Sequence, residues 1–366
     1  MDYYDFGLCG GLSEANVDVT LYTCDETAVK TAVPYTLRFP YRRIYGDAPA
    51  WMRGARYVRG SVGALLRAKL GGTRVAHFHF FHVGPLELFN VALARALGLR
   101  VVVTAHDVRS FVERLSVPWM VERAYRLAHR VIAQSEVAER ELGTKVPMHK
   151  MTVIPHGNYL HVIDETPARE EARERLGLSG EGGVLLFFGQ IKEVKGLDVL
   201  LRAMPRLIRE RPDTTLLIAG KVWKDDFEKY RRQIDALRIS GNCVLDIRFI
   251  PDPEVAGYYA AADMVVLPYR RIYQSGVLLM AMSYGRPVMV SDIEGMTEVV
   301  SDGENGYVFP AGDDEALAER LIEVMSRPEE MRRVGARALS HMHKHHGWDA
   351  IGQSTAECYR AALKAG

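Results

Sequence analysis

The sequence predicts an α/β protein built from two doubly wound domains. Short β-branched runs alternate with longer amphipathic stretches along the chain, which is the pattern of parallel strands connected by helices. Ten such runs indicate two sheets rather than one, and 366 residues are enough for two domains. The hydrophobic content of 48% and the charged content of 25% are typical of a folded globular chain.

The strand-like runs form two groups along the chain. The first group is VDVTLYT (17–23), RVAHFHF (74–80), LRVVVTAHD (99–107), RVIAQS (130–135) and MTVIPHG (151–157). The second group is GVLLFFGQ (183–190), TTLLIAG (214–220), CVLDIRFI (243–250), ADMVVLPY (262–269) and RPVMVSD (286–292). The charged, glycine-rich stretch between the groups indicates a linker and a first helix. We therefore expect domains at 1–160 and 161–345, followed by a helix at 346–366 that packs back on the first domain.

The beginning of the chain is unusual for this fold class. A doubly wound domain normally begins with a buried strand and a glycine-rich turn. Here MDYYDFGLCGGLSEAN (1–16) predicts a helix instead. Either Met1 is an internal start within a longer protein, or another segment fills the place of that strand. We favour the former.

Composition and charge narrow the class of protein. The formal net charge of +1 gives the chain no overall attraction to nucleic acid, and no nucleic-acid reading motif is present. Neither a long apolar run nor a signal-peptide pattern occurs. The four cysteines lie far apart without CxxC spacing, as expected of reduced thiols. We therefore expect a cytoplasmic protein.

The ends of the predicted strands are the first candidates for a site, because open parallel sheets bind ligands beyond their carboxyl ends. In the first domain His106 and His156 follow strands, while His77 and His79 lie within the earlier strand and His82 lies just beyond it. In the second domain the strand ends carry glycines, lysines and the start of a helix: Gly189, Gln190, Lys192, Lys195, Gly196, Lys221, Ser275 and Gly276. Backbone N–H groups, a helix N-terminus and lysines suit a diphosphate. GxxxxGK[ST] is absent, which leaves an NTPase without support.

Several segments match a known family in order and spacing. They are TAHD (104–107), VIPHG (153–157), FFGQIKEVKGLDVLL (187–201), LLIAG (216–220) and the long stretch at 262–313. In these segments the chain resembles the retaining family-4 glycosyltransferases of the GT-B fold. The resemblance implies two Rossmann-like domains facing a cleft and transfer of a sugar from a nucleotide-sugar donor with retention. It also implies that no metal and no cofactor take part, the nucleotide sugar being a co-substrate.

The resemblance implies roles for individual residues. Lys195 would bind the donor diphosphate and His106 would hydrogen-bond the transferring sugar, which makes these two the candidate catalytic residues. His79, Phe80 and Asp107 would lie on the acceptor side. The other donor-binding candidates are Gly189, Gln190, Lys192, Tyr273, Ser275, Gly276, Val277, Leu278 and Glu298.

The chain departs from the family pattern at three positions. Gln190 stands where the family commonly has arginine, and Ile272 and Met280 stand where it has two glutamates. Methionine cannot accept the ribose hydrogen bonds that the second glutamate accepts. Hydrogen bonds to a charged acceptor are worth about 1.5–3 kcal/mol each, so we expect donor binding to be weaker by a factor on the order of 10². Polar contacts from Tyr273, Glu294 or Glu298 could replace part of this loss.

Two functional interpretations follow. The first is a glycosyltransferase that acts on a glycan or lipid-linked acceptor in cell-surface polysaccharide assembly. The second is a non-catalytic GT-B scaffold that partners an active transferase, suggested by Ile272, Met280 and the absent first strand. Single residues also have a purely structural interpretation. Without the resemblance, His106 is interpreted as a structural histidine and Met280 as part of the apolar core. HMHKHH (341–346) is interpreted as a polar surface.

Residues 30–74 combine basic and aromatic side chains around the single acid Asp47. The basic residues include Arg38, Arg42, Arg43, Arg53, Arg56, Arg59, Arg67 and Lys69, and the aromatic ones Tyr35, Phe39, Tyr41, Tyr45, Trp51 and Tyr57. A helix over 48–70 would place Trp51, Ala55, Val58, Val62 and Leu65 along one side. Such a surface favours an anionic membrane, with a basic face over buried aromatics as the alternative. We hypothesise peripheral docking on the inner membrane leaflet.

Overall fold

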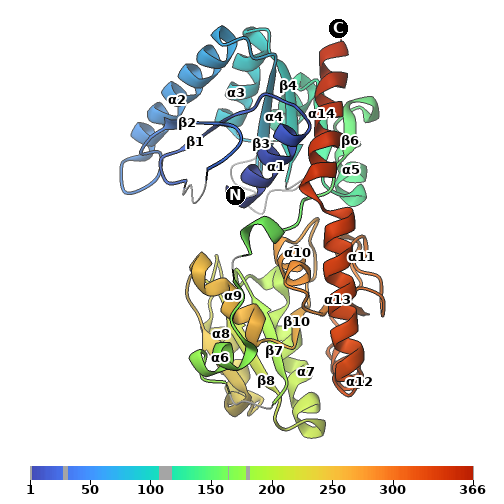
Figure 1. Ribbon diagram of the computed structural model, residues 1–366. Helices are drawn as coiled ribbons and strands as arrows, with labels where there is room; N and C mark the ends of the chain where they lie inside the picture. Colours follow the sequence, from blue (N-terminus) through green and yellow to red (C-terminus); the bar gives the residue numbers. More distant parts are fainter. Residues whose placement is uncertain (1, 28–31, 107–117, 164, 179–181, 366) are drawn as a thin grey trace. The chain divides into compact units, whose positions relative to one another are not determined.

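The computed structural model describes residues 2–27, 32–106, 118–163, 165–178 and 182–365 (Figure 1). The chain divides into two compact units. Unit 1 comprises Met1–Gly157 together with His346–Gly366, and unit 2 comprises Asn158–His345. Unit 1 is therefore built from two separate stretches of the chain.

Unit 2 contains a six-stranded, fully parallel sheet in the order β12-β11-β10-β7-β8-β9. The strands are β7 (Val184–Phe188), β8 (Thr215–Ala219), β9 (Cys243–Asp246), β10 (Met264–Leu267), β11 (Val288–Ser291) and β12 (Tyr307–Phe309). The longer helices are α7 (Leu197–Glu210), α8 (Glu228–Ala236), α9 (Asp252–Ala261), α10 (Gly276–Ser283), α12 (Asp314–Met325) and α13 (Pro328–His345). The shorter ones are α6 (Arg169–Arg175) and α11 (Glu294–Thr297).

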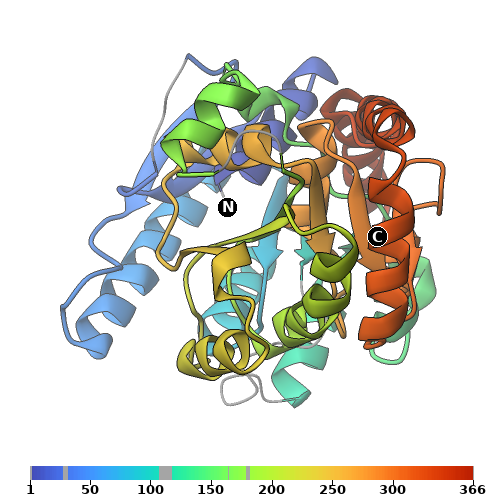
Figure 2. The ribbon, with the colours of Figure 1, turned by 90° about the horizontal axis from the view of Figure 1, so that it is seen from below.

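Both faces of this sheet are covered, because successive residues of a strand point to opposite sides. Leu185 and Phe187 of β7 pack in one apolar core with α7 and α12. Val184 and Leu186 pack in the other core with α9 and α10. Figure 2 shows helices of unit 2 on either side of its strands. This arrangement explains why β7 and β10 are apolar at every position, as parallel strands buried on both faces require.

Unit 1 contains a four-stranded parallel sheet and a separate pair of strands. The sheet has the order β3-β4-β5-β6, formed by Val75–Phe80, Arg100–Ala105, Arg130–Ala133 and Met151–Val153. The pair consists of β1 (Thr20–Cys24) and β2 (Thr36–Tyr41). The helices are α1 (Asp2–Glu14), α2 (Ala50–Leu70), α3 (Pro85–Ala96), α4 (Pro118–Leu127), α5 (Glu136–Leu142) and α14 (Trp348–Lys364).

Helices α1 and α14 pack closely against each other in unit 1. A Cβ atom on Gly11 would lie 1.9 Å from the carbonyl oxygen of Trp348, and one on Gly7 would meet the Trp348 ring. Tyr4, Leu8 and Leu12 of α1 share a core with Ile351 of α14 and with Val102, Ile132 and Ile154 from the sheet region. The first helix and the last helix thus lie side by side on one face of the sheet (Figure 1).

The sequence-based expectations on the fold are confirmed in class and differ in detail. The two α/β units and the returning helix α14 are present. Strands β2 and β12 were not predicted. In the described part of unit 1, helix α1 covers a face of the sheet and β1 pairs with β2. No helix in the described part of the chain combines the length and apolar character needed to cross a bilayer.

Candidate functional site

The loops that follow β7 and β8 in unit 2 approach each other so closely that only glycine fits. Gly220 has φ +144°, and a Cβ atom there would lie 1.8 Å from the carbonyl oxygen of Gly189. Gly189 has φ +100°, and a Cβ atom on it would be 3.0 Å from Val277 Cγ2 at the start of α10. Glycine adopts positive φ without strain. These contacts bring the ends of β7 and β8 and the N-terminus of α10 together.

A short extension carries Lys192 and Trp223 beyond the ends of β7 and β8. The amide of Ile191 donates to the carbonyl of Lys221 at 2.9 Å, and the amide of Trp223 donates to the carbonyl of Ile191 at 3.0 Å. The Lys192 Nζ lies 5.8 Å from the centroid of the Trp223 ring. An aromatic face next to an ammonium group stabilises the positive charge at this edge of the sheet.

Lys195 is held in place by an aromatic ring and a left-handed turn. Its Nζ lies 3.7 Å from the centroid of the Tyr269 ring, within the range of a cation–π contact. Tyr269 is 1% exposed, and burial raises the pKa of its hydroxyl, so the ring carries no charge at neutral pH. The next residue, Gly196, has φ +66° and packs against the Pro268 carbonyl. The ammonium group therefore has a defined position near the end of β10.

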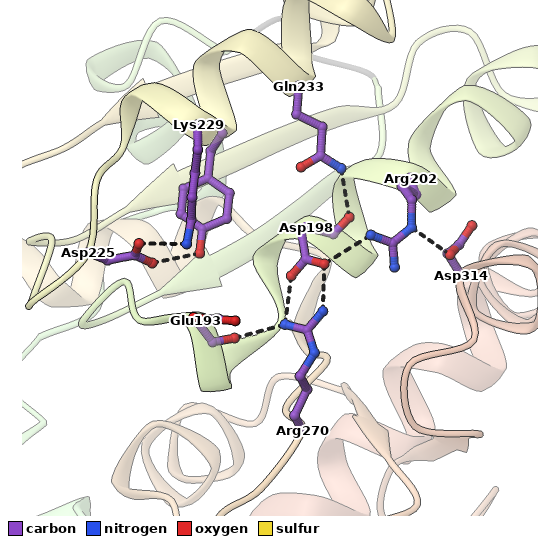
Figure 3. A network of polar contacts seen from close by, with 9 residues as sticks. Glu193, Asp198, Arg202, Asp225, Lys229, Gln233, Arg270 and Asp314 are labelled. Atoms are coloured by element: carbon purple, nitrogen blue, oxygen red, sulfur yellow. Dashed lines mark hydrogen bonds and ion pairs between the residues drawn. The ribbon is translucent and has the colours of Figure 1, made fainter. Parts of the chain in front are cut away.

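Arg270 anchors the loop that carries Lys192 and Lys195, through the contacts with Glu193 and Asp198 that Figure 3 shows. Its Nη1 donates to the Glu193 carbonyl at 2.9 Å and to Asp198 Oδ1 at 2.8 Å, and its Nη2 donates to Asp198 Oδ2 at 2.6 Å. Its backbone amide donates to the Val194 carbonyl at 2.9 Å. Burial raises the pKa of Asp198, but hydrogen bonds from Arg270 and Arg202 outweigh burial and leave that pKa low. Arg270 thus fixes the position of this loop.

The N-terminus of α10 presents backbone N–H groups near this loop. Ser275 is its N-cap, and the Ser275 Oγ accepts a hydrogen bond from the Leu278 amide at 3.2 Å. A Cβ atom on Gly276 would lie 2.7 Å from the Tyr159 hydroxyl, so Tyr159 lies close to this helix end. The amides and the partial positive charge of the helix end suit an anion. The lysines, the glycines and this helix end are brought together.

Two of the three altered positions of the family pattern have apolar surroundings. Ile272 and Met280 are partly buried and pack against the core that α9 and α10 share. A Cβ atom on Gly295 of α11 would lie 2.2 Å from the Ile272 carbonyl oxygen, so α11 lies against this loop. Glu298 is the C-cap of α11 and is exposed, while Tyr273 is 6% exposed. Gln190 is exposed next to Gly189.

The strand ends of unit 1 hold a cluster of histidines. His79 Nδ1 lies 3.0 Å from His106 Nε2, and the Phe81 ring stacks on His106 at 4.5 Å with 8° between the planes. The ring of Tyr4, from α1, contacts both His79 and His106 edge-on at 5.2 and 4.8 Å. His106 is only 8% exposed. Tyr4 and Phe81 therefore cover His106 within unit 1.

Burial sets the charge of this cluster. The pKa of His79 is lowered to about 4 by burial and by the neighbouring His156, and burial followed by the nearby histidines lowers that of His106. His77 bonds Tyr359 Oη and Thr104 Oγ1, each at 2.7 Å, and burial lowers its pKa too. The imidazoles are neutral at pH 7. They form hydrogen bonds within unit 1, and the described residues contain no metal-binding cluster of three or more such side chains.

The other acceptor-side candidates are placed differently from one another. Phe80 is 4% exposed and lies inside unit 1, whereas Phe81 is 40% exposed. Asp107 lies outside the described residues. Sequence reasoning did not find Tyr4, Tyr159 or Trp223 as parts of these sites. Their signals are weak, because each approaches its partner through a contact that no local motif encodes.

Two family models match the chain over nearly its whole length. The model described as Glycosyltransferase Family 4 matches residues 6–158, and the model described as Glycosyl transferases group 1 matches residues 168–341. These matches confirm the class that the strand-end motifs predict. The chain belongs to the family-4 glycosyltransferases of the GT-B fold.

Individual relatives agree with this class. The D-inositol 3-phosphate glycosyltransferase of Thermobispora bispora is 30% identical over 66% of this chain, but the match spans only 58% of that relative. The protein of the same name from Streptomyces scabiei is 26% identical and is covered to 86%, over 99% of this chain. The alpha-D-kanosaminyltransferase of Streptomyces kanamyceticus is 26% identical, with 86% of this chain and 84% of that protein covered.

Solved structures share the fold. Sucrose-phosphate synthase from Thermosynechococcus elongatus matches with a TM-score of 0.76 at 19% identity, covering 98% of this chain and 92% of that one. HepE from Anabaena, solved in complex with UDP, matches with a TM-score of 0.72 at 18% identity, covering 90% of this chain and 87% of that one.

Proposed function

We propose that this protein is a retaining, metal-independent glycosyltransferase that moves a sugar from a nucleoside-diphosphate donor to a glycan or lipid-linked acceptor in cell-surface polysaccharide assembly. The observation that carries the proposal is the position of Lys195, whose ammonium group lies over Tyr269 at the strand ends of unit 2. Family membership and the neighbour HepE, which was solved with UDP, support the same class of donor.

The residues of unit 2 account for holding the leaving group. Lys195, Lys192 and the α10 amides would stabilise the charge that develops on the diphosphate when its bond to the anomeric carbon breaks. The acceptor hydroxyl forms the new bond on the same face of the sugar, and its proton passes to the departing diphosphate oxygen. Such catalysis depends on alignment and charge stabilisation, which a rigid loop anchored by Arg270 supports.

The ribose of the donor would be bound less strongly than by a glutamate at position 280. Met280 packs against an apolar core and has no charged acceptor to offer. Lys192 beside Trp223 and Lys195 over Tyr269 would keep the interaction with the diphosphate. We therefore propose weak nucleotide binding that depends mainly on the diphosphate.

The test is calorimetric binding of UDP, GDP and ADP to the full chain, followed by transfer assays with the matching sugars. Lys195→Ala should weaken binding of the preferred nucleotide by up to about 10², because a contact with a charged group contributes roughly 1.5–3 kcal/mol, and it should abolish transfer, because the leaving group loses its charge stabilisation. Lys344→Ala, an exposed lysine of the same unit, is the control and should bind as the wild type does. Equal nucleotide affinity in Lys195→Ala and wild type would contradict the proposal.

The acceptor side of the proposal includes docking on an anionic membrane through residues 30–74. In the structure α2 buries Gly60, Ser61, Ala64, Leu65 and Ala68. Trp51 is 74% exposed and Tyr45 is 56% exposed, and Arg59, Arg67 and Lys69 are exposed as well. The predicted apolar stripe is thus split, because Leu65 enters the core and Trp51 does not. Exposed aromatics beside basic residues favour a membrane surface.

Flotation with anionic liposomes tests the docking. Wild type should float at low salt, and the Arg59→Ser, Arg67→Ser double variant should float less, because each basic residue near an anionic surface contributes about 1 kcal/mol. Arg209→Ser, an exposed arginine on α7, serves as the control. Absence of flotation at low salt for the wild type refutes this part of the proposal.

A non-catalytic scaffold is the second candidate, and one observation favours it. Tyr4 and Phe81 cover His106, the candidate that would contact the sugar. A scaffold predicts that purified protein neither transfers nor hydrolyses any nucleotide sugar and that Lys195→Ala leaves its partner's activity unchanged. Transfer or donor hydrolysis that is lost in Lys195→Ala excludes it.

A further inference from the structure

A cluster of cations lies at the amino ends of β4 and β5 in unit 1, the opposite end of the strands from the histidines His79 and His106. We call it the amino-edge cluster, and it consists of Arg95, Arg100, His129, Arg130 and Lys150. Arg95 is on the last turn of α3, and Arg100 and Arg130 are the first residues of their strands. No part of the proposed donor or acceptor site uses these residues.

His129 has a fixed orientation and a fixed tautomer. Its backbone amide donates to the Val101 carbonyl at 2.8 Å, and its Nδ1 accepts from the Val101 amide at 2.8 Å. The residue is 8% exposed. An imidazole whose Nδ1 accepts a hydrogen bond carries its proton on Nε2 when it is neutral. The Nε2–H of His129 is therefore a hydrogen-bond donor.

Two guanidinium groups meet this donor. Arg100 Nη1 lies 3.0 Å from His129 Nε2, and Arg95 Nη1 contacts the same nitrogen. Guanidinium nitrogens only donate hydrogen bonds. Three donors from separate residues thus converge on one point, and the hydrogen bonds that each could make there need an acceptor.

Within the described residues, no acid neutralises the positive charge of the cluster. In the part of the chain that the structure describes, no carboxylate forms an ion pair with Arg95, Arg100, Arg130 or Lys150. Lys150 Nζ donates to the carbonyls of Arg126 and Ala128 at 2.9 and 3.1 Å, and Arg130 donates to the carbonyl of His149. Burial, then Arg95, Arg100 and Lys150, lower the pKa of His129 to about 4. Burial, then Arg95 and Arg130, lower the pKa of Lys150.

We propose that the amino-edge cluster is a binding site for a phosphate-type oxyanion, held by Arg95, Arg100 and the Nε2–H of His129. Oxyanions accept several hydrogen bonds at once and match the planar arginine fork. Arg95 is exposed, which opens the point of convergence to solvent. A water molecule could accept from two of the donors, but it would leave the like charges uncompensated, whereas a phosphate oxygen answers both requirements.

The site is distinct from the proposed donor site. The donor candidates lie at the carboxyl ends of strands in unit 2, and the amino-edge cluster lies at the amino ends of strands in unit 1. The phosphate can belong to a free phosphate compound or to a phosphomonoester lipid headgroup, because both present the same terminal phosphate group. The protein binds it without any covalent change.

The experiment uses full-length protein in the Lys195→Ala background, so that the diphosphate loop of unit 2 contributes little. Calorimetry with inorganic phosphate, at an ionic strength matched with chloride, should detect binding. The Arg95→Gln, Arg100→Gln double variant should bind phosphate at least about tenfold more weakly, because two charge-assisted hydrogen bonds are lost. Arg209→Gln is the control and should bind phosphate as its parent does.

Two further readouts separate binding from folding. In phosphate-free buffer the double variant should melt no earlier than its parent, because removing like charges relieves repulsion. The His129 Nε2–H resonance should shift on addition of phosphate in the parent and not in the double variant. Vesicles of phosphatidylcholine with and without phosphatidic acid form the lipid arm.

The outcomes are distinct. Binding of inorganic phosphate that the double variant loses supports a soluble ligand, and cosedimentation with phosphatidic acid alone that the double variant loses supports a headgroup. No binding in either arm, or equal phosphate binding by parent and double variant, overturns the proposal. Failure of nucleotide binding in the separate donor experiment would leave this result untouched.

Discussion

The strand ends of the two units carry opposite chemistry on similar parallel sheets. In unit 1 the ends of β3 and β4 hold imidazoles that are buried, neutral and bonded to one another. In unit 2 the ends of β7 and β10 hold ammonium groups beside aromatic rings and a helix N-terminus. The comparison teaches that the parallel sheet supplies the place for a site, while burial and neighbouring groups decide which charge that place can hold.

The largest expected effect concerns the neutral histidines and pH. Folding lowers the pKa of His77, His79 and His106, so the unfolded chain binds their protons first. The stability they preserve is present above about pH 6.5 and is lost as the pH falls from there toward 4. Each such histidine contributes a slope of up to about 1.4 kcal/mol per pH unit.

Denaturant unfolding at several pH values measures that slope. His79→Gln should flatten the loss between pH 6.5 and 4, whereas His343→Gln, an exposed histidine of α13, should leave it unchanged. A stability that does not depend on pH in this range would mean that the histidines are solvated.

The next expected effect concerns the stability of unit 1, which depends on the packing of α1 against α14. Gly11→Ala should destabilise unit 1 by about 3 kcal/mol, because its Cβ atom would overlap the Trp348 carbonyl and the backbone must move. Gly10→Ala is a matched control on the same helix, where a Cβ atom meets nothing within 4 Å. It should be neutral or slightly stabilising. Thermal unfolding compares them, and equal melting temperatures would show that α1 does not pack on α14.

A smaller effect tests the loop of unit 2. Arg270→Gln removes the bidentate contact with Asp198 and the bond to the Glu193 carbonyl, which should loosen the position of Lys195. We expect about tenfold weaker nucleotide binding, since such charge-assisted bonds contribute roughly 1.5 kcal/mol or more. Arg206→Gln, which removes surface pairs with Glu315 and Glu319, should not change binding. Calorimetry distinguishes the two variants.

The smallest effect asks whether the clamp of unit 2 can be restored. Met280→Glu should raise nucleotide affinity by up to about tenfold, because a carboxylate can accept hydrogen bonds from ribose hydroxyls. Met280→Gln has a similar shape without the charge and should gain less. Unchanged affinity in both variants would show that the partly buried position 280 does not face the ribose.

The fold was predictable where the sequence contains strong local patterns. The apolar runs of β7, β8 and β10 could be recognised because both faces are buried. Strand β2 was missed because Pro40 lies inside it, and proline argues against a strand. Strand β12 was missed because its three residues lie between Gly306 and Pro310, in a stretch whose residues are typical of a turn. Helix α1 was predicted, but its packing on α14 depends on residues more than three hundred positions away.

The sequence predicted which residues follow the strands at the candidate site, but not which contacts each of them makes. Lys195 and the start of α10 were identified from their positions after strands, and their roles stay predictions. Arg270 follows β10 in the same way, yet it pairs with Asp198 and anchors a loop. The cover over His106 comes from Tyr4, about a hundred residues away in sequence. These contacts depend on which side chain, distant in sequence, packs against a given residue in the folded protein. A local sequence pattern does not encode that.

The division of unit 1 into two stretches also bears on how the protein is made. Residues 1–157 leave the ribosome long before His346–Gly366 is translated, and all of unit 2 is synthesised in between. During that interval α14, which shares a core with α1 and with Val102, Ile132 and Ile154, has not yet been synthesised. Synthesis of unit 1 thus begins first and is completed last. Unit 2 can finish folding while unit 1 still exposes an apolar surface to which chaperones can bind.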